Sequence, residues 1–189
     1  LGLVGWRTGS RLHLLQIIMR LAVFRLVFLA AIFVGMNSAL AQAPASIPSF
    51  TLKKFEGDET VSLDQFSDGV VVLDFFAYWC VPCRKVSTEL EEHVQQFYAE
   101  KNGNPAGKPV QVLSLNIEQG RIARTRQYIR QTGASLVLDD VGGRVYKALG
   151  GRGIPFVIVL AKESNQWNVL YAHAGYDGVE KIRTVIDSV

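Results

Sequence analysis

Cysteine and histidine are scarce in this sequence, with two cysteines and three histidines among 189 residues. This scarcity excludes a framework of several disulfides. A structural zinc site needs about four ligands, and the histidines are not paired at the spacing of metal ligands; they are His13, His93 and His173. Glycine forms no nucleotide-binding pattern, and the chain has no internal repeat. We therefore expect neither a metal nor another cofactor.

Acidic residues are missing from positions 1–41, which carry four arginines. The remaining chain has 16 basic and 17 acidic residues, so the formal charge of +3 belongs to this N-terminal segment. A second group of arginines, between Arg121 and Arg130, has no aromatic residues interleaved for stacking on bases. We interpret this group as a solvated helix face and expect no nucleic-acid partner.

Positions 1–41 have the zones of a secretory signal peptide. Two arginines precede an apolar run over 26–35, and Ala39-Leu40-Ala41 ends the segment. We expect translation to start at Met19, cleavage to follow Ala41, and the mature protein to be periplasmic or otherwise extracytoplasmic. An uncleaved N-terminal membrane anchor is the alternative, although a span needs about 20 apolar residues.

A single domain is expected over 47–189, after a linker over 42–46 that is rich in small residues and proline. Short alternating runs at 50–52 and 61–63 indicate a β-hairpin. The run over 70–76 consists mostly of β-branched and aromatic residues. Such a run is typical of a strand buried on both faces of a layered α/β sheet.

After the cysteines, apolar residues at helical spacing predict an amphipathic helix from residue 83 to about residue 100. A second buried strand over 110–117 follows, and we expect it to lie parallel to the first. The later elements are predicted as a basic helix over 121–131, a strand over 135–138, a helix over 144–149, strands over 156–161 and 168–172, and a final helix from about residue 178.

The chemistry is expected at Trp79-Cys80-Val81-Pro82-Cys83, where the buried strand ends and the helix begins. The first turn of a helix offers unpaired N–H groups and the positive end of the dipole, which lower the pKa of a cysteine there. A disulfide that closes so short a loop adds little stability, so a redox pair is favoured over a structural staple. We assign Cys80, at the cap, as the nucleophile and Cys83 as the resolving thiol.

The stretch over 73–84 resembles the active-site strand and turn of the TlpA/ResA-like branch of the thioredoxin superfamily. The leading hairpin, a helix inserted after Asn116 and the segment Gly153-Ile154-Pro155 match the same branch in the same order. The resemblance covers residues 47–189. It implies a thioredoxin fold, with a central mixed β-sheet flanked by helices, an N-terminal β-hairpin and an inserted helix.

The same resemblance implies how a substrate is bound. Pro155 should be a cis-proline that faces the disulfide, and the backbone of Ile154 should pair with an extended substrate segment. Residues around the nucleophile, namely Trp79, Val81 and Pro82, should contact that segment as well.

Two positions depart from the branch, because Val86 stands where an acid is common and Thr88 where a proline is common. The missing acid weakens the interpretation that the protein acts specifically on apocytochrome c. Asp74 on the buried strand resembles ordinary thioredoxins instead. We expect burial to raise the pKa of Asp74 and expect Asp74 to exchange a proton with Cys83.

These features predict an extracytoplasmic oxidoreductase that reduces or isomerises protein disulfides and takes electrons from a membrane or periplasmic donor protein. The reducing direction is favoured because no histidine lies between the cysteines, in contrast to the oxidases that the chain resembles. A Sco-like copper-binding assembly chaperone is one alternative, but its cysteines are spaced one residue further apart. A thiol peroxidase is another, but it would carry a threonine where this chain has Ala77.

Overall fold

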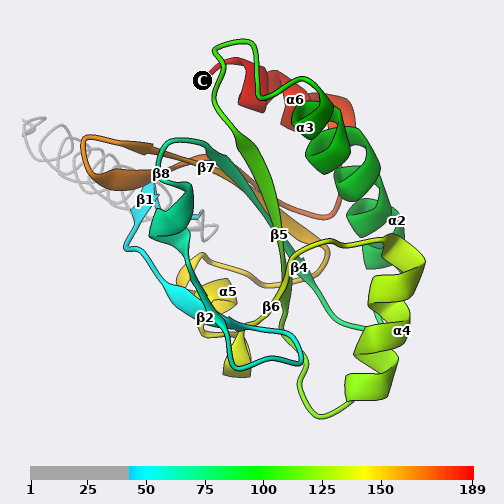
Figure 1. Cartoon of the computed structure of the whole chain (residues 1–189). Helices are drawn as coiled ribbons and strands as arrows, with labels where there is room; N and C mark the ends of the chain where they lie inside the picture. Colours follow the sequence, from blue (N-terminus) through cyan, green and yellow to red (C-terminus); the bar gives the residue numbers. More distant parts are fainter. Residues whose placement is uncertain (1–42) are drawn as a thin grey trace, which may run out of the picture. The chain divides into compact units, whose positions relative to one another are not determined.

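The structure, a computed structural model, describes residues 43–189, which belong to one compact unit. Within these residues, eight strands form one sheet in the order β1-β8-β7-β4-β5-β6-β2-β3 (Figure 1). The signal peptide expected over 1–41 lies outside the described residues. The strands are β1 (Ser46–Ile47), β2 (Thr51–Lys54), β3 (Thr60–Ser62), β4 (Val70–Phe76), β5 (Val110–Asn116), β6 (Val137–Asp139), β7 (Phe156–Glu163) and β8 (Gln166–Ala174).

Helices cover both faces of this mixed sheet. Short 3-10 turns occur at Leu63–Phe66 and Val141–Gly143, and a π-helical segment occurs at Glu91–Gln96. The α-helices are α2 (Val81–Leu90), α3 (Phe97–Glu100), α4 (Ile122–Thr132), α5 (Arg144–Ala148) and α6 (Val179–Asp187). The predicted α/β architecture with an N-terminal hairpin and an inserted helix, α4, is confirmed.

Strand β4 lies inside the sheet, and all seven of its residues are buried. It pairs antiparallel with β7 and parallel with β5, as expected for two strands joined through a helix. The strand starts directly after Gly69, where an added Cβ atom would lie 2.5 Å from the carbonyl oxygen of Pro109. Only glycine lets β4 and the loop before β5 approach this closely.

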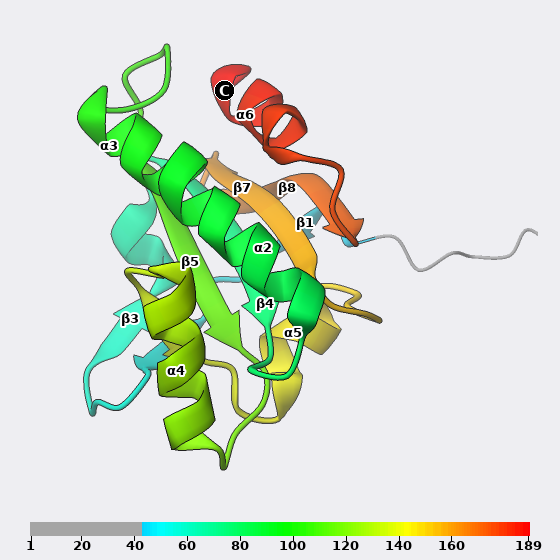
Figure 2. The ribbon, with the colours of Figure 1, turned by 90° about the vertical axis from the view of Figure 1, so that its right-hand side faces the viewer.

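Alternation along β4 decides which face each side chain meets. Leu73 and Phe75 pack in a core cluster with residues of β2, β3 and the end of α5. Val70 and Val72 pack in a second cluster with residues of α2, α3 and α6, and Figure 2 shows α2, α3 and α4 in front of the sheet. Asp74 has the same parity as Val70 and Val72, so it points to the face that α2 covers.

The helix predicted from residue 83 begins two residues earlier, at Val81. The Cys80 side chain caps it, and Pro82 stands in the first turn. Proline is well tolerated there because the missing N–H would have no partner within the helix. The cysteine motif itself therefore sets the start of the helix.

The middle of the same helix winds as a π-helix rather than continuing as α-helix. Glu91, in this segment, is buried, and its Oε2 accepts hydrogen bonds of 3.1 Å from both the backbone N–H and the hydroxyl of Ser135. These bonds tie the helix to the chain before β6. They also explain why β6 starts at Val137, two residues later than predicted, since Ser135 is bound to the helix instead of a neighbouring strand.

The sheet also begins earlier than the predicted domain boundary. Ser46, which the sequence places in the linker, forms β1 together with Ile47 and pairs with β8. The carbonyl oxygen of Ala45 accepts a hydrogen bond from Val169 N at 2.9 Å. This short segment therefore pairs with backbone groups on the outer edge of β8 that would otherwise lack a partner. The predicted β2–β3 hairpin is confirmed, and β2 pairs with β6 on its other side.

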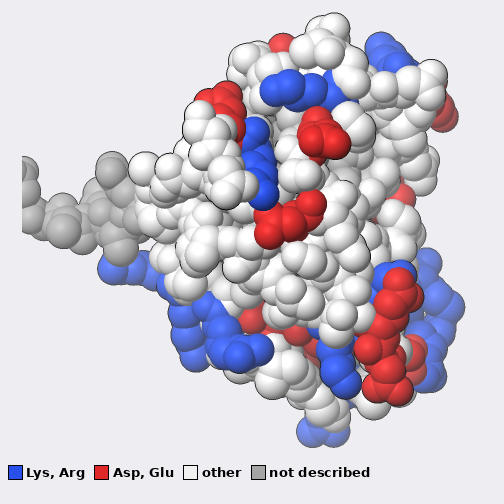
Figure 3. Space-filling view, turned by 60° about the vertical axis from the view of Figure 1, so that its left-hand side comes forward, with Lys and Arg blue, Asp and Glu red and all other residues white. Residues whose placement is uncertain are grey.

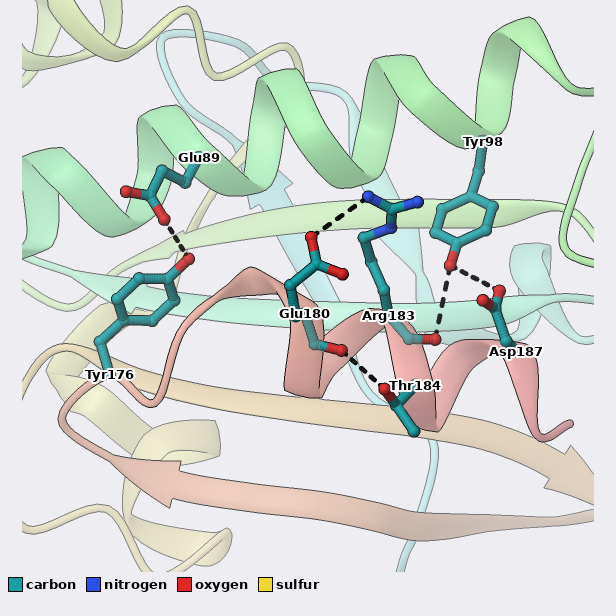
Figure 4. A network of polar contacts seen from close by, with 7 residues as sticks. All are labelled: Glu89, Tyr98, Tyr176, Glu180, Arg183, Thr184 and Asp187. Atoms are coloured by element: carbon teal, nitrogen blue, oxygen red, sulfur yellow. Dashed lines mark hydrogen bonds and ion pairs between the residues drawn. The ribbon is translucent and has the colours of Figure 1, made fainter.

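Polar contacts hold α6 and the loop before it against the long helix (Figure 4). The Tyr98 hydroxyl donates a hydrogen bond to Asp187 Oδ1 at 2.7 Å, and the Tyr176 hydroxyl donates one to Glu89 Oε2 at 2.5 Å. The Tyr98 hydroxyl therefore has a structural role, because it holds α6 against α3.

Candidate active site

Cys80 and Cys83 form a disulfide at the start of α2. The sulfur of Cys80, the N-cap residue, accepts a hydrogen bond from the backbone N–H of Cys83 at 3.2 Å. Cys80 is 4% exposed and Cys83 is fully buried. Because the same N–H and the helix dipole would stabilise a thiolate on Cys80, the geometry favours the outer cysteine as the nucleophile.

Apolar side chains stand exposed around this disulfide. Trp79 is 54% and Val81 is 69% exposed, and Pro82 is exposed as well. Ile154 packs against the cluster that contains both cysteines, and the peptide bond between Ile154 and Pro155 is cis, as the resemblance implied. The structure thus brings the expected substrate-contact residues to one place. An exposed apolar rim of this kind is suited to binding another protein chain.

Asp74 lies beneath α2 and is fully buried. Burial raises the pKa of Asp74 to about 7, and the hydrogen bond that Asp74 Oδ2 accepts from Ser87 Oγ at 2.5 Å opposes this rise only in part. The expected direction of the shift is confirmed. The other carboxylate oxygen, Oδ1, has no hydrogen-bond partner among residues 43–189. The carboxyl group can therefore gain or lose a proton near neutral pH.

Ser87 and Tyr128 extend the polar cluster around Asp74, and neither is among the residues predicted from the sequence. The Ser87 and Tyr128 hydroxyl oxygens lie 2.7 Å apart. The Tyr128 ring, which comes from α4, stacks on Phe76 with centroids 4.4 Å apart. Ser87 follows Cys83 by four residues and so shares its helix face, which is a usable signal. Nothing comparable marks Tyr128, because its place depends on how α4 packs.

Comparisons with known proteins assign the family of this chain. Residues 44–165, which include both cysteines and Asp74, match the AhpC/TSA family. The chain belongs to that family. Its thioredoxin-like fold and its resemblance to the TlpA/ResA-like branch are both supported by the relatives and solved structures described next.

The AhpC/TSA chain is similar to the thiol-disulfide oxidoreductases ResA of Bacillus thuringiensis and Bacillus cereus, with 26% identity over 117 residues in each case. The match covers 61% of this chain and 62% of each relative, so it spans less than two thirds of their length. A solved Chlorobium tepidum structure, described as a thiol:disulfide interchange protein DsbE, has 25% identity and a TM-score of 0.61 and covers 78% of this chain and 96% of its own. StoA from Bacillus subtilis shares the fold, with 23% identity, a TM-score of 0.54, and coverage of 75% of this chain and 98% of its own.

A cleft of about 670 Å³ opens beside the Cys80–Cys83 disulfide of this AhpC/TSA domain. Its lining includes Trp79, Arg84 and residues of α4, among them Arg124 and Tyr128. Arg84 Nη2 donates a hydrogen bond to the carbonyl oxygen of Tyr78 at 3.1 Å, which fixes one wall. Arg124 is exposed, as expected for the arginine group on α4, but it also borders this cleft.

Within residues 43–189, no group of three or more His, Cys, Asp or Glu side chains is arranged to hold a metal ion. His93 lies exposed on the π-helical segment, and His173 Nε2 lies 3.2 Å from Asp177 Oδ1. In the same part of the AhpC/TSA chain, no helix combines the length and apolar character that a membrane crossing requires.

Proposed function

We propose that this chain is a thiol–disulfide oxidoreductase that acts on protein disulfides or thiols, with Cys80 and Cys83 as its redox pair. The observation that carries the proposal is the disulfide at the N-terminus of α2, directly beside exposed apolar side chains. A cysteine in that position reacts as a thiolate. The names of the ResA relatives, which match 61% of this chain, support the same activity.

In the reducing direction, the Cys80 thiolate attacks a client disulfide. A bond between Cys80 and one client sulfur forms, and the other client sulfur leaves as a thiolate that takes a proton from water. Cys83 then gives its proton to Asp74 and attacks Cys80. The Cys80–Cys83 bond forms as the bond between Cys80 and the client sulfur breaks. That sulfur leaves as a thiolate and takes a proton from water, so the client keeps the two electrons. A donor protein reduces the pair again, and the rim around Trp79 and Ile154 positions the client.

We expect the reduction potential of the Cys80–Cys83 pair to lie near that of thioredoxin, about −270 mV, rather than near the value of about −120 mV for the oxidase DsbA. Val81 and Pro82 provide no histidine between the cysteines to stabilise the reduced form. Equilibration in dithiothreitol or glutathione buffers, followed by alkylation of free thiols, measures the potential. A value near −120 mV would reverse the proposed direction, while copper binding or peroxide consumption by the same protein would favour the chaperone or the peroxidase.

We further propose an extracytoplasmic location, which the signal-peptide pattern over 1–41 supports. When the gene is expressed from Met19 in a bacterial host, N-terminal sequencing of the periplasmic protein should begin at Gln42. An inactivated signal peptidase should leave the longer form in the membrane. A protein that keeps Met19 in normal cells and sediments with membranes would show an anchor in place of a cleaved signal.

Partners are proposed to be proteins, namely disulfide-bearing clients and an electron donor, and not nucleic acids. On the face seen in Figure 3, basic side chains gather at the lower left, and acidic and basic side chains lie side by side over the upper part and at the lower right. Arg126, from the arginine group on α4, forms an ion pair with Glu56. An electrostatic surface for a phosphate backbone would instead need a continuous basic stripe.

A further inference from the structure

We propose that Ser87 and Tyr128 form a proton relay between buried Asp74 and water in the cleft beside the redox pair. The proposal rests on the role in resolution proposed above for Asp74, and it makes Ser87 and Tyr128 positioning residues for that step. It answers a physical problem of the site. Asp74 has no exposed surface, so the proton that its carboxylate takes from Cys83 can exchange with solvent, in the oxidised state, only through neighbouring groups.

The relay is a continuous chain of oxygen atoms from three elements. Asp74 on β4 accepts a hydrogen bond of 2.5 Å from Ser87 on α2, and the Ser87 oxygen lies 2.7 Å from the hydroxyl of Tyr128 on α4. Both distances are short enough for proton transfer between hydrogen-bonded groups. Ser87 is 2% exposed and Tyr128 is 1% exposed, but Tyr128 also lines the cleft of about 670 Å³. Tyr128 therefore lies between the buried cluster and the solvent.

The packing of Tyr128 keeps this path in place. Its ring stacks on Phe76, two residues along β4 from Asp74, with an angle of 9° between the ring planes. Tyr128, Phe76 and both cysteines belong to one cluster of buried residues. A hydroxyl group held in this way needs little rearrangement to pass a proton on.

The other neighbours of Asp74 offer no equivalent route. Its partners in the sheet are Ser114 on β5 and Val157 on β7. The Ser114 hydroxyl also lowers the pKa of Asp74, but Ser114 is buried and does not line the cleft. The titratable groups around the cluster are the thiol of Cys83 on α2, which supplies the proton, and Tyr176 before α6, whose hydroxyl donates to Glu89. The cations on this side are Arg84, which is bound to the Tyr78 carbonyl, and Lys85 and Arg124, which line the same cleft.

Each transfer in the relay conserves protons. The Cys83 thiol gives its proton to the Asp74 carboxylate, and a half-turn of the carboxyl group brings this proton to Ser87. The Ser87 hydroxyl, which donates to Asp74 in the structure, first turns toward Tyr128. Ser87 then accepts the proton from Asp74 and gives its own hydroxyl proton to Tyr128, which in turn gives its hydroxyl proton to a water molecule in the cleft. Burial and the nearby Asp74 charge both raise the pKa of Tyr128, so Tyr128 stays neutral before and after the transfer. The net result is one proton moved from Cys83 to solvent.

Tyr128→Phe tests the relay, because it keeps the ring stacked on Phe76 and removes only the hydroxyl. We expect resolution of the mixed disulfide at pH 7 to slow by about ten-fold, less than the roughly 10²–10⁴-fold that a proton-transfer group itself contributes, because the relay acts only through Asp74. The pKa of Asp74, followed by the infrared absorption of its carboxyl group, should stay close to that of the wild type, since the Ser87 bond remains. The solvent deuterium isotope effect on resolution should rise.

Three further variants complete the experiment, all measured by stopped-flow with a small-molecule disulfide. Ser87→Ala should slow resolution and also raise the pKa of Asp74, because the lost hydrogen bond stabilises the charged form. Ser87→Thr retains a hydroxyl group and should restore much of the rate. Tyr98→Phe is the matched control, since it removes the hydroxyl of another buried tyrosine that binds a carboxylate on α6 (Figure 4), and it should resolve at the wild-type rate.

The outcomes separate the relay from the function on which it rests. A wild-type rate in Tyr128→Phe, combined with slow resolution in Asp74→Asn, would overturn the relay and leave the role of Asp74 intact. Wild-type rates in both variants would remove the role of Asp74 and the relay together. In a third outcome, Tyr128→Phe resolves slowly and the pKa of Asp74 shifts by an amount that accounts for the slower rate. Tyr128 would then have only a structural role, which also overturns the relay.

Discussion

Cys83→Ser is expected to accumulate covalent complexes with a client protein, and Cys80→Ser is expected to form none. Cys80 caps α2 and can still attack a client disulfide when Cys83 is absent, but no thiolate then follows to release the client. Cys83 is fully buried, so in Cys80→Ser the remaining thiol cannot reach a disulfide on another protein. Turnover should fall to background in both variants, because each lacks one of the two sulfurs of the cycle.

Incubation of each variant with insulin, followed by non-reducing electrophoresis and mass spectrometry, measures the trapped complex. The double variant, with serine at both positions, controls for complexes that form by other routes. Circular dichroism should show the same fold in all three proteins, since the disulfide closes a loop too short to contribute much stability. Equal trapping by the two single variants would show that the assignment of nucleophile and resolving thiol is wrong.

The central part of the fold was open to prediction because its residues admit few alternatives. A run of seven residues that is mostly β-branched and aromatic is typical of a strand buried on both faces, and β4 has that environment. The cysteine motif likewise determines where the strand ends and the helix begins, because Cys80 is the N-cap of α2. Local sequence and tertiary structure agree at these positions.

The parts that could not be predicted depend on contacts between distant segments. The Ser87–Tyr128 pair joins residues 41 positions apart, and Glu91 reaches Ser135 over 44 positions. No local periodicity carries that information. The short strand β1 is a similar case, since Ser46 and Ile47 are ordered by the free edge of β8 rather than by a pattern of their own. An acid is common at the position of Val86 in the branch that the chain resembles, whereas in this chain the acid of the site is Asp74 on β4.

Asp74→Asn is expected to stabilise the folded protein at neutral and alkaline pH and to slow resolution near pH 7. Burial raises the pKa of Asp74 from 3.8 to about 7. Between these values the unfolded chain releases the proton while the folded protein keeps it, so the free energy of unfolding falls as pH rises. At about 1.4 kcal/mol per pKa unit, the cost approaches 4 kcal/mol above pH 7 as an upper limit. Asparagine avoids this cost because it does not titrate, and it still accepts the hydrogen bond from Ser87.

Urea denaturation of the oxidised wild type and Asp74→Asn at pH 4, 6 and 8 measures this difference. The advantage of Asp74→Asn should be small at pH 4, grow through pH 6 and level off above pH 7. Asp64→Asn provides a control of opposite sign, because hydrogen bonds from Lys162 and Trp167 lower the pKa of Asp64 to about 2. That pairing contributes stability above pH 4 and loses it as pH falls toward 2, so Asp64→Asn should lower the free energy of unfolding at pH 8. If Asp74→Asn and the wild type differ by the same amount at all three pH values, Asp74 does not titrate in the folded protein between pH 4 and 8 and cannot serve as the proton acceptor for Cys83.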